Sequence, residues 1–199
     1  MKIIAATANK GKAAEIEEIF GALGFEVVTM REAGIDSEPE ENGKTFLENA
    51  LIKARAAHEL AESAYIIADD SGLCVDALDG APGIYSARYA GEGATDAEKI
   101  DKLLGELDGK KNRAAHFETA VALITPSGEE ITAHGEVRGT ILTAPDGENG
   151  FGYDPVFYCD EIGKTFANAT SDEKNEVSHR GRALRALYEK IKNKVGEGE

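Results

Sequence analysis

Two adjacent acidic residues, Asp69 and Asp70, directly follow the apolar run from Tyr65 to Ala68. A short apolar run of this kind is typical of a buried strand, so we expect a strand that ends at Ala68. Two neighbouring charges beside a core cost several kcal/mol each, roughly, unless they are paired or bind a metal ion. Ligand sites in α/β folds form where strands end. The pair therefore predicts a metal site at the end of this strand, more than a feature of packing.

The composition limits the partners that such a site could have. The chain has 199 residues, of which 42% are hydrophobic, and this suits one continuous domain over 1–199, either a single body or two lobes. Its net charge of −15 should repel nucleic acids and anionic membranes, so we expect neither as a partner. A polyanionic ligand would need a local basic cluster or a divalent cation.

The two cysteines indicate a reducing environment. Cys74 and Cys159 are not arranged as CxxC, and we expect both to be small apolar residues that fill space near the core. The N-terminal run reads as a strand and not as a signal peptide, and no run approaches the roughly 20 apolar residues of a membrane span. These features predict a cytoplasmic location.

Strand-like and helix-like segments alternate in the first half, and a hairpin follows in the second. This order predicts a mixed sheet flanked by helices, and the long glycine-containing loops suggest a cleft between two lobes. The expected strands cover 2–6, 25–30 and 65–68, the hairpin pairs 116–125 with 130–138, and the expected helices cover 11–23, 45–62, 95–107 and 178–194.

The segment from Thr7 to Lys12 lies at a strand-to-helix junction. A helix N-terminus presents free N–H groups and a positive dipole end, which suit phosphate, and Lys12 adds a full charge. The alternative is a helix that is simply capped by Asn9. Two segments that end like a phosphate-binding P-loop, 43–45 and 163–165, lack the upstream glycine and are excluded.

An acidic loop with Glu40, Glu41 and Asn42 precedes the helix that carries Lys53. With Asp69 and Asp70, its carboxylates could complete an oxygen-ligand shell for Mg²⁺. The alternative is an acidic loop that is only solvated.

Two further segments suggest a nucleotide base. Flanking glycines in 150–155 let the backbone approach a ligand, and Phe151 could stack on a base, although it could equally fill the core. His179 and Arg180 open the last helix, where cations oppose the helix dipole, so their placement suggests a ligand, although the segment could equally be a surface turn of charged residues. The guanidinium fork suits the O6 and N7 of a purine.

The order of these motifs along the chain resembles that of the inosine/xanthosine triphosphate pyrophosphatase family, over nearly the whole length. The resemblance rests on Thr7-x-Asn9-x-x-Lys12, Thr45-Phe46-x-Glu48-Asn49-Ala50, Asp69-Asp70-Ser71-Gly72-Leu73, Gly80-Ala81-Pro82-Gly83-x-Tyr85-Ser86-Ala87-Arg88, Phe151-Gly152-Tyr153-Asp154-Pro155 and Ser178-His179-Arg180-Gly181.

This resemblance implies an elongated α/β fold with a central mixed, twisted sheet, two lobes and a nucleotide cleft between them. It also implies a homodimer that depends on Mg²⁺. The implied reaction is the hydrolysis of ITP, dITP or XTP to the monophosphate and pyrophosphate, which keeps deaminated purines out of DNA and RNA.

The resemblance also assigns roles. Asp70 is implied as the catalytic base and, with Glu41, as a metal ligand. The implied substrate-binding residues are Thr7, Ala8, Asn9, Lys10, Gly11, Lys12, Lys53, Ser71, Phe151, Gly152, Tyr153, Asp154, Lys174, His179 and Arg180. Ala8 departs from the family, which has glycine there, and it would be strained if the position required a positive φ.

Three alternatives stay open from the sequence. An aspartyl-nucleophile phosphatase would also place acids after a strand, although it favours Asp-x-Asp over adjacent acids. A nucleotide-sensing module would bind without turnover. A related pyrophosphatase would act on other modified nucleotides.

Overall fold

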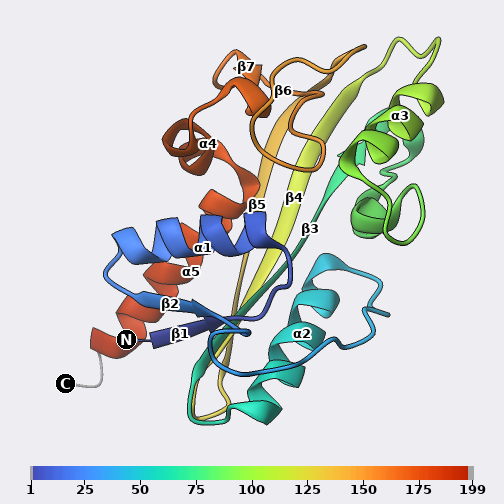
Figure 1. Ribbon diagram of the computed structural model, residues 1–199. Coiled ribbons are helices and arrows are strands. Elements are labelled where there is room, and N and C mark those ends of the chain that lie inside the picture. Colours follow the sequence, from blue (N-terminus) through green and yellow to red (C-terminus); the bar gives the residue numbers. More distant parts are fainter. Residues whose placement is uncertain (1, 197–199) are drawn as a thin grey trace. The chain divides into compact units, whose positions relative to one another are not determined.

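The computed structural model describes residues 2–196 (Figure 1). The chain divides into two units that interleave along the sequence. The first unit holds the described residues of Met1–Asp70, Thr119–Gly135 and Arg180–Glu199, and the second holds Ser71–Glu118 and Glu136–His179.

Within residues 2–196, seven strands form one sheet in the order β2-β1-β3-β4-β5-β6-β7. Strand β1 pairs in parallel with β2 and β3, whereas β6 is antiparallel to both β5 and β7. The sheet is therefore mixed and the fold is α/β, as the sequence predicts. The strands are β1 Lys2–Ala5, β2 Glu26–Thr29, β3 Tyr65–Val75, β4 Ala114–Ile124, β5 Glu130–Ile141, β6 Phe157–Cys159 and β7 Lys164–Thr165.

Five α-helices are present in the described residues: α1, α2 and α3 lie between strands in the sequence, and α4 and α5 follow the last strand (Figure 1). Four begin after a residue whose side chain accepts a hydrogen bond from a first-turn N–H group: Asn9, Thr45, Thr95 and Thr170. Thr95 and Glu98 form a capping box, in which each side chain accepts from the main-chain N–H of the other residue. The helices are α1 Lys10–Ala22, α2 Phe46–Leu60, α3 Asp96–Glu106, α4 Ser171–Val177 and α5 His179–Gly196.

Alternating residues of the strands bury two separate layers in the first unit. Ile3 and Ile67 pack in the cluster that contains Phe20 of α1 and Leu184 of α5. Ile4, Ile66 and Ala68 pack on the opposite face with Ala50, Ala54 and Ala57 of α2. Small alanines on α2 allow this helix to approach the strands closely. Helices therefore cover both faces of the sheet in this unit.

A third cluster forms the core of the second unit. Leu73 and Val75 of β3 pack there with Phe117 of β4, Phe157 of β6 and Leu103 of α3. Phe117 and Phe157 have ring centroids 4.6 Å apart. No α-helix among the described residues is long and apolar enough to cross a bilayer.

The expectation that β3 ends at Ala68 is wrong, because the strand continues to Val75. Asp69 and Asp70 therefore lie inside a strand and not after it. Gly72 explains why the strand can continue beneath a packed segment: a Cβ at this position would lie 2.2 Å from the carbonyl oxygen of Gly83. The amide of Leu73 donates to Ser86 Oγ at 2.9 Å and holds that segment, the 3-10 helix Gly83–Arg88, in place.

Gly72→Ala is expected to lower the free energy of unfolding by about 1–3 kcal/mol, since the added methyl group would overlap the carbonyl oxygen of Gly83 and force the backbone to shift. Urea denaturation checks this. Gly105→Ala is the matched control, because no atom lies within 4 Å of its added Cβ and alanine favours helix by about 0.5–1 kcal/mol. Equal effects of the two substitutions would contradict the close-packing argument.

The other expected elements are present with shifts of a few residues, and the expected hairpin corresponds to β4 and β5. The sequence interpretation omitted β6, β7 and α4. These elements have only 3, 2 and 7 residues, which is too short for a periodic pattern to reveal.

Candidate functional site

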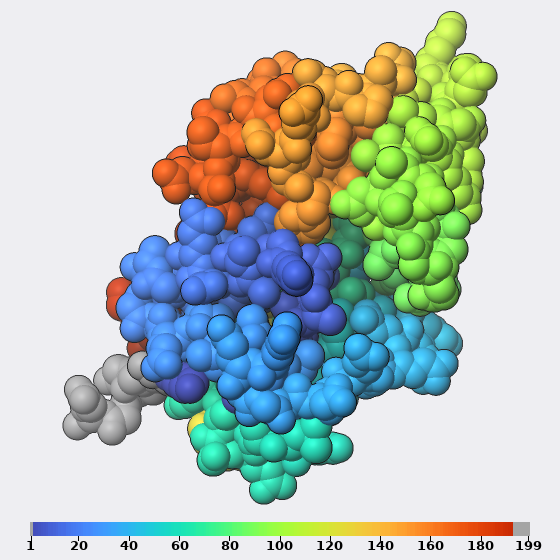
Figure 2. All heavy atoms as spheres, viewed as in Figure 1, coloured from blue at the N-terminus to red at the C-terminus, as the bar shows by residue number. Residues whose placement is uncertain are grey.

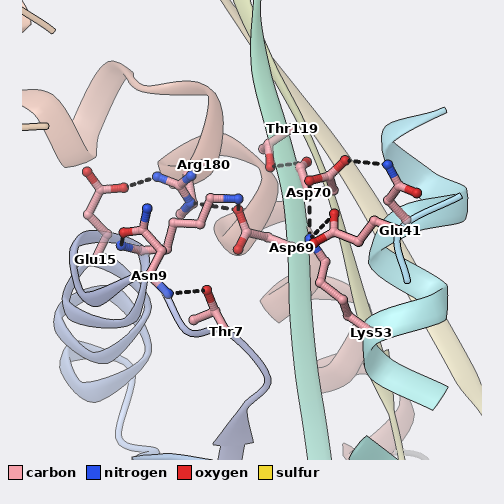
Figure 3. A network of polar contacts seen from close by, with 11 residues as sticks. Thr7, Asn9, Glu15, Glu41, Lys53, Asp69, Asp70, Thr119 and Arg180 are labelled. Atoms are coloured by element: carbon pink, nitrogen blue, oxygen red, sulfur yellow. Dashed lines mark hydrogen bonds and ion pairs between the residues drawn. The ribbon is translucent and has the colours of Figure 1, made fainter. Parts of the chain in front are cut away.

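Asp69 and Asp70 point to opposite sides of β3, as neighbouring residues in a strand must (Figure 3). The two carboxylates therefore belong to two different polar groups. Both residues are buried, with 1% of Asp69 and 7% of Asp70 exposed. Each carboxylate consequently needs its own compensating partners.

The Asp70 carboxylate receives contacts from two side chains of α2. Its Oδ2 accepts a hydrogen bond from Asn49 Nδ2 at 3.1 Å, and its Oδ1 lies 3.1 Å from Lys53 Nζ. Lys53 Nζ also contacts Glu41 Oε2 at 3.1 Å, so one ammonium group joins two carboxylates. Thr119 Oγ1 donates to the main-chain oxygen of Asp70 at 2.9 Å. These contacts fix both the backbone and the side chain of Asp70.

Helix α2 supplies these partners because Asn49 and Lys53 are four residues apart and lie on one face of the helix. Thr45 caps the helix through its hydroxyl, which accepts from the amide of Glu48 at 3.1 Å. Asn49 Oδ1 in turn accepts from the amide of Gly43 at 2.9 Å. Asn49 therefore connects Asp70 to the loop that carries Glu41. This loop is seen in light blue at the surface in Figure 2.

The charges around Asp70 oppose one another. Burial raises the pKa of Asp70 above its ordinary value, and the nearby ammonium groups of Lys53 and Lys12 only partly offset this. Burial alone would lower the pKa of Lys53, but Asp70 and the other carboxylates raise it instead. Lys53 therefore stays charged, while Asp70 is a stronger base than an exposed aspartate.

The residues on this side of β3 fit a divalent metal ion such as Mg²⁺. Two carboxylate oxygens, from Asp70 and Glu41, already converge on a single cationic atom, the ammonium nitrogen of Lys53. Hard divalent cations prefer such an all-oxygen donor set of one or two carboxylates completed by phosphate and water. Glu41 keeps about a third of its side chain exposed, which leaves the group accessible from solvent.

The Asp69 carboxylate lies in a buried ionic network with α1 and α5 (Figure 3). Its Oδ2 is 3.1 Å from both Lys12 Nζ and Arg180 Nε. Arg180 Nη1 also contacts Glu15, and the side chain of Arg180 is only 2% exposed. Burial alone would raise the pKa of Asp69, but Lys12 and Arg180 hold it well below its ordinary range. Asp69 is therefore ionised at neutral pH, and its ion pairs hold α1, α5 and β3 together.

The Thr7–Lys12 segment connects β1 to α1. Asn9 caps the helix by accepting from the amide of Lys12 at 3.1 Å, and Thr7 Oγ1 accepts from the amide of Asn9 at 3.2 Å. Among the non-glycine residues that the structure describes, only Asp79 has a positive φ, so Ala8 is not strained. Ala8, Asn9 and Lys10 are exposed at this helix end, while Lys12 turns towards Asp69.

A separate polar group lies in the second unit around Asp154. Its Oδ2 accepts hydrogen bonds from Lys174 Nζ at 2.7 Å and from the amide of Phe151 at 2.9 Å. Lys174 Nζ also lies 4.4 Å from the centroid of the Phe151 ring, in reach of a cation–π contact. Phe151 is half-buried, so its ring is held in place while part of it stays accessible.

The neighbours of Phe151 have structural contacts of their own. The amide of Gly152 donates to Asp96 Oδ2 at 2.7 Å, and the Tyr153 hydroxyl donates to the main-chain oxygen of Ser86 at 3.0 Å. Tyr153 is buried in the core of the unit. The His179 ring stacks on Phe117 with centroids 4.8 Å apart and planes 12° apart.

The structure thus gathers Glu41, Lys53 and Asp70 into one group, and Phe151, Asp154 and Lys174 into another. Lys12 and Arg180 meet at Asp69, where the guanidinium of Arg180 contacts two carboxylates. Ser71 is half-buried in β3, directly after Asp70. Sequence reasoning gave no role to Asn49, Glu15 or Thr119. Of these three, only Asn49 could have been found from the sequence, since it belongs to the motif that starts at Thr45 and lies one helical turn before Lys53.

A model of the Ham1 family matches residues 3–190. The chain belongs to the Ham1 family. This Ham1-family chain is 49% identical over 198 residues to a dITP/XTP pyrophosphatase of Clostridium perfringens, with 96% of this chain and 97% of the relative covered. It is 48% identical over 200 residues to a dITP/XTP pyrophosphatase of Caldanaerobacter subterraneus, with 99% of both chains covered.

Solved structures agree with this assignment. The structure of the Ham1 protein of Staphylococcus aureus matches this chain with a TM-score of 0.86 and 40% sequence identity, and the match covers 98% of this chain. The match spans 100% of the Staphylococcus chain. A Ham1 protein of Coxiella burnetii gives the same TM-score and identity over 97% of this chain and 99% of its own.

Proposed function

We propose that this protein hydrolyses the triphosphates of deaminated purines, ITP, dITP and XTP, to the monophosphate and pyrophosphate. Such a reaction removes these nucleotides from the pool that feeds DNA and RNA synthesis. The observation that carries the proposal is the 48–49% identity, over nearly the full length, to relatives named dITP/XTP pyrophosphatase. The carboxylates and lysines around β3 supply groups that this chemistry needs.

In this proposal Asp70 orients a water molecule and takes its proton as the water attacks the α-phosphorus. The raised pKa of Asp70 suits a general base, and Asn49 and Thr119 hold the residue in one orientation. Asp70 and Glu41 would hold Mg²⁺, which when bound neutralises charge on the phosphate oxygens. Lys53 keeps its positive charge beside both carboxylates and limits their mutual repulsion.

The triphosphate is assigned to Thr7, Ala8, Asn9, Lys10, Gly11 and Lys12, together with Lys53 and Ser71. The exposed N-terminal turn of α1 offers backbone N–H groups, which favour phosphate at the positive end of the helix dipole. Lys10, Lys12 and Lys53 give this region a local positive charge in a chain whose net charge of −15 would repel the ligand.

The base and sugar are assigned to Phe151, Gly152, Tyr153, Asp154, Lys174 and His179. The half-buried Phe151 ring offers a stacking surface, and Lys174 offers donors to a 6-oxo purine. The resemblance assigns Arg180 to this set as well. Because its guanidinium contacts Asp69 and Glu15, we propose that Arg180 acts as a positioning residue.

The opposite directions of Asp69 and Asp70 argue against an aspartyl-nucleophile phosphatase. That chemistry needs two carboxylates near one phosphorus atom, and these two lie on opposite sides of β3 (Figure 3). Asp69 is in addition held between Lys12 and Arg180. A nucleotide-sensing module and a pyrophosphatase for other modified nucleotides remain distinguishable by turnover and by substrate choice.

Pyrophosphate release from ITP, dITP, XTP, GTP and ATP, with and without Mg²⁺, tests the proposal. We expect Mg²⁺-dependent release from the first three, with kcat/KM for ITP about a hundredfold or more above that for ATP. Donors that suit a 6-oxo group would be left unpaired against the 6-amino group of adenine. Orthophosphate as the product would indicate a phosphatase, and binding without turnover would indicate a sensor.

We also propose a homodimer in the cytoplasm, on the strength of the family resemblance and of a cysteine usage that suits a reducing compartment. Sedimentation of the purified protein checks the oligomeric state.

A further inference from the structure

A group of three potential metal ligands lies in the second unit and takes no part in the proposed reaction. Cys74 of β3 and His116 and Glu118 of β4 place one ligand atom each so that all three atoms lie within 4.8 Å of one another. His116 Nε2 is 3.8 Å from Glu118 Oε2. The two strands are neighbours in the sheet, and His116 and Glu118, two residues apart, share one face of β4.

This face of the sheet is the one turned away from the core of the unit. Phe117, between His116 and Glu118, packs in that core with Leu73 and Val75, which flank Cys74. Cys74 is 8% exposed, whereas the side chains of His116 and Glu118 are 24% and 31% exposed. Of the three residues, Cys74 is therefore buried, while His116 and Glu118 remain accessible to solvent.

Cys159 shows what a space-filling cysteine looks like in the same unit. It is fully buried in the core cluster with Phe157 and Phe166. Cys74 instead lies beside an imidazole and a carboxylate, and a second carboxylate, Glu136 of β5, is close enough to affect its thiol. Cys74 is thus surrounded by side chains that can bind a cation.

We propose that Cys74, His116 and Glu118 bind a zinc ion that ties β3 to β4. Sulfur, imidazole nitrogen and carboxylate oxygen are the three donor types that Zn²⁺ accepts, and three protein ligands leave a fourth position for water. A thiolate and an imidazole disfavour Mg²⁺ and Ca²⁺, which take oxygen ligands. One thiolate and one carboxylate also balance the two charges of the ion, so no uncompensated charge is buried.

The geometry needs only a small closure. Donor atoms of a tetrahedral zinc site lie roughly 3.3–3.8 Å apart, given bond lengths of about 2.0–2.3 Å. The 3.8 Å separation of His116 Nε2 and Glu118 Oε2 is a few tenths of an ångström longer than the roughly 3.3–3.5 Å of a nitrogen–oxygen pair in such a site, and the limit of 4.8 Å for the group requires a shift of about an ångström. The partly exposed side chains of His116 and Glu118 can make this shift by rotation.

Titration of chelator-treated protein with Co²⁺, a spectroscopic substitute for Zn²⁺, tests the site. The titration contains excess Mg²⁺ so that oxygen-only sites are occupied. We expect a near-ultraviolet charge-transfer band from the Cys74 thiolate, at one Co²⁺ per chain, that Zn²⁺ abolishes by competition. Cys74→Ser should remove the band. His116→Ala and Glu118→Gln should each weaken Co²⁺ binding about a hundredfold or more, since even indirect partners of a metal contribute 10–100-fold.

Cys159→Ser is the matched control and should keep the band, with circular dichroism to confirm that each variant folds. Should Cys74→Ser not fold, His116→Ala, at a partly exposed position, carries the test. Saturating Zn²⁺ should also raise the unfolding temperature of the wild type but not of Cys74→Ser, because binding to the folded state alone stabilises it. Absence of the band in the wild type, or its persistence in Cys74→Ser, would overturn the proposal.

Discussion

Replacement of Asp70 by Asn is expected to lower kcat for pyrophosphate release from ITP about 10³- to 10⁴-fold, while nucleotide binding stays measurable. The amide has nearly the same shape as the carboxylate and can still accept the hydrogen bond of Asn49 Nδ2. It cannot take a proton, however, and it removes the negative charge that lies 3.1 Å from Lys53 Nζ. Loss of a general base alone costs about 10²–10⁴-fold, and loss of a carboxylate metal ligand adds to this.

Stopped assays for pyrophosphate give kcat and KM, and equilibrium binding of ITP is measured in parallel. Asp76→Asn is the matched control, because Asp76 directly follows the same strand but is exposed at the start of a 3-10 helix. That control should keep near wild-type turnover. Near-normal turnover in Asp70→Asn would remove Asp70 from the mechanism, and loss of nucleotide binding would show that the substitution acts on the ground state.

Local patterns predicted most of the first unit, because its helices are periodic and its strands are short apolar runs. The apolar residues Ile16, Ile19 and Phe20 mark the buried face of α1, and the apolar runs around Ile3 and Ile67 mark the strands. The end of β3 was predicted wrongly, and the reason is physical. Two acidic residues and Gly72 break the apolar pattern, yet the strand continues because tertiary partners neutralise the acids and a loop packs on the glycine.

Residue types alone predicted which groups carry charge at the site but not how they pair. The sequence suggested that Glu41, Lys53 and Asp70 belong to one group, but it did not indicate that Asn49 holds Asp70 in place. Arg180 was expected at a base, whereas its guanidinium contacts Glu15, which is 165 residues away in the sequence. The two residues lie on different helices, so no periodic pattern in the sequence could predict that they are in contact.

The same network gives the largest expected effect on stability. Arg180→Met should lower the free energy of unfolding by about 3–5 kcal/mol, because it leaves two buried carboxylates without their shared cation. The side chains of Asp69 and Glu15 are 0% and 11% exposed, so water cannot replace the guanidinium. Methionine keeps much of the volume of the arginine stem, so the cavity contribution stays small. Urea denaturation at neutral pH measures the difference.

Arg55→Met provides the matched control for this substitution. Arg55 also binds a carboxylate, at 2.6 Å from Glu130, but its side chain is 55% exposed, so its loss should cost about 1 kcal/mol or less. A double variant, Arg180→Met with Glu15→Gln, should recover part of the stability, since it keeps the Lys12–Asp69 ion pair and a neutral amide costs less to bury than a charge. Equal losses for Arg180→Met and Arg55→Met, or a further loss in the double variant, would show that packing and not the buried charges determines the effect.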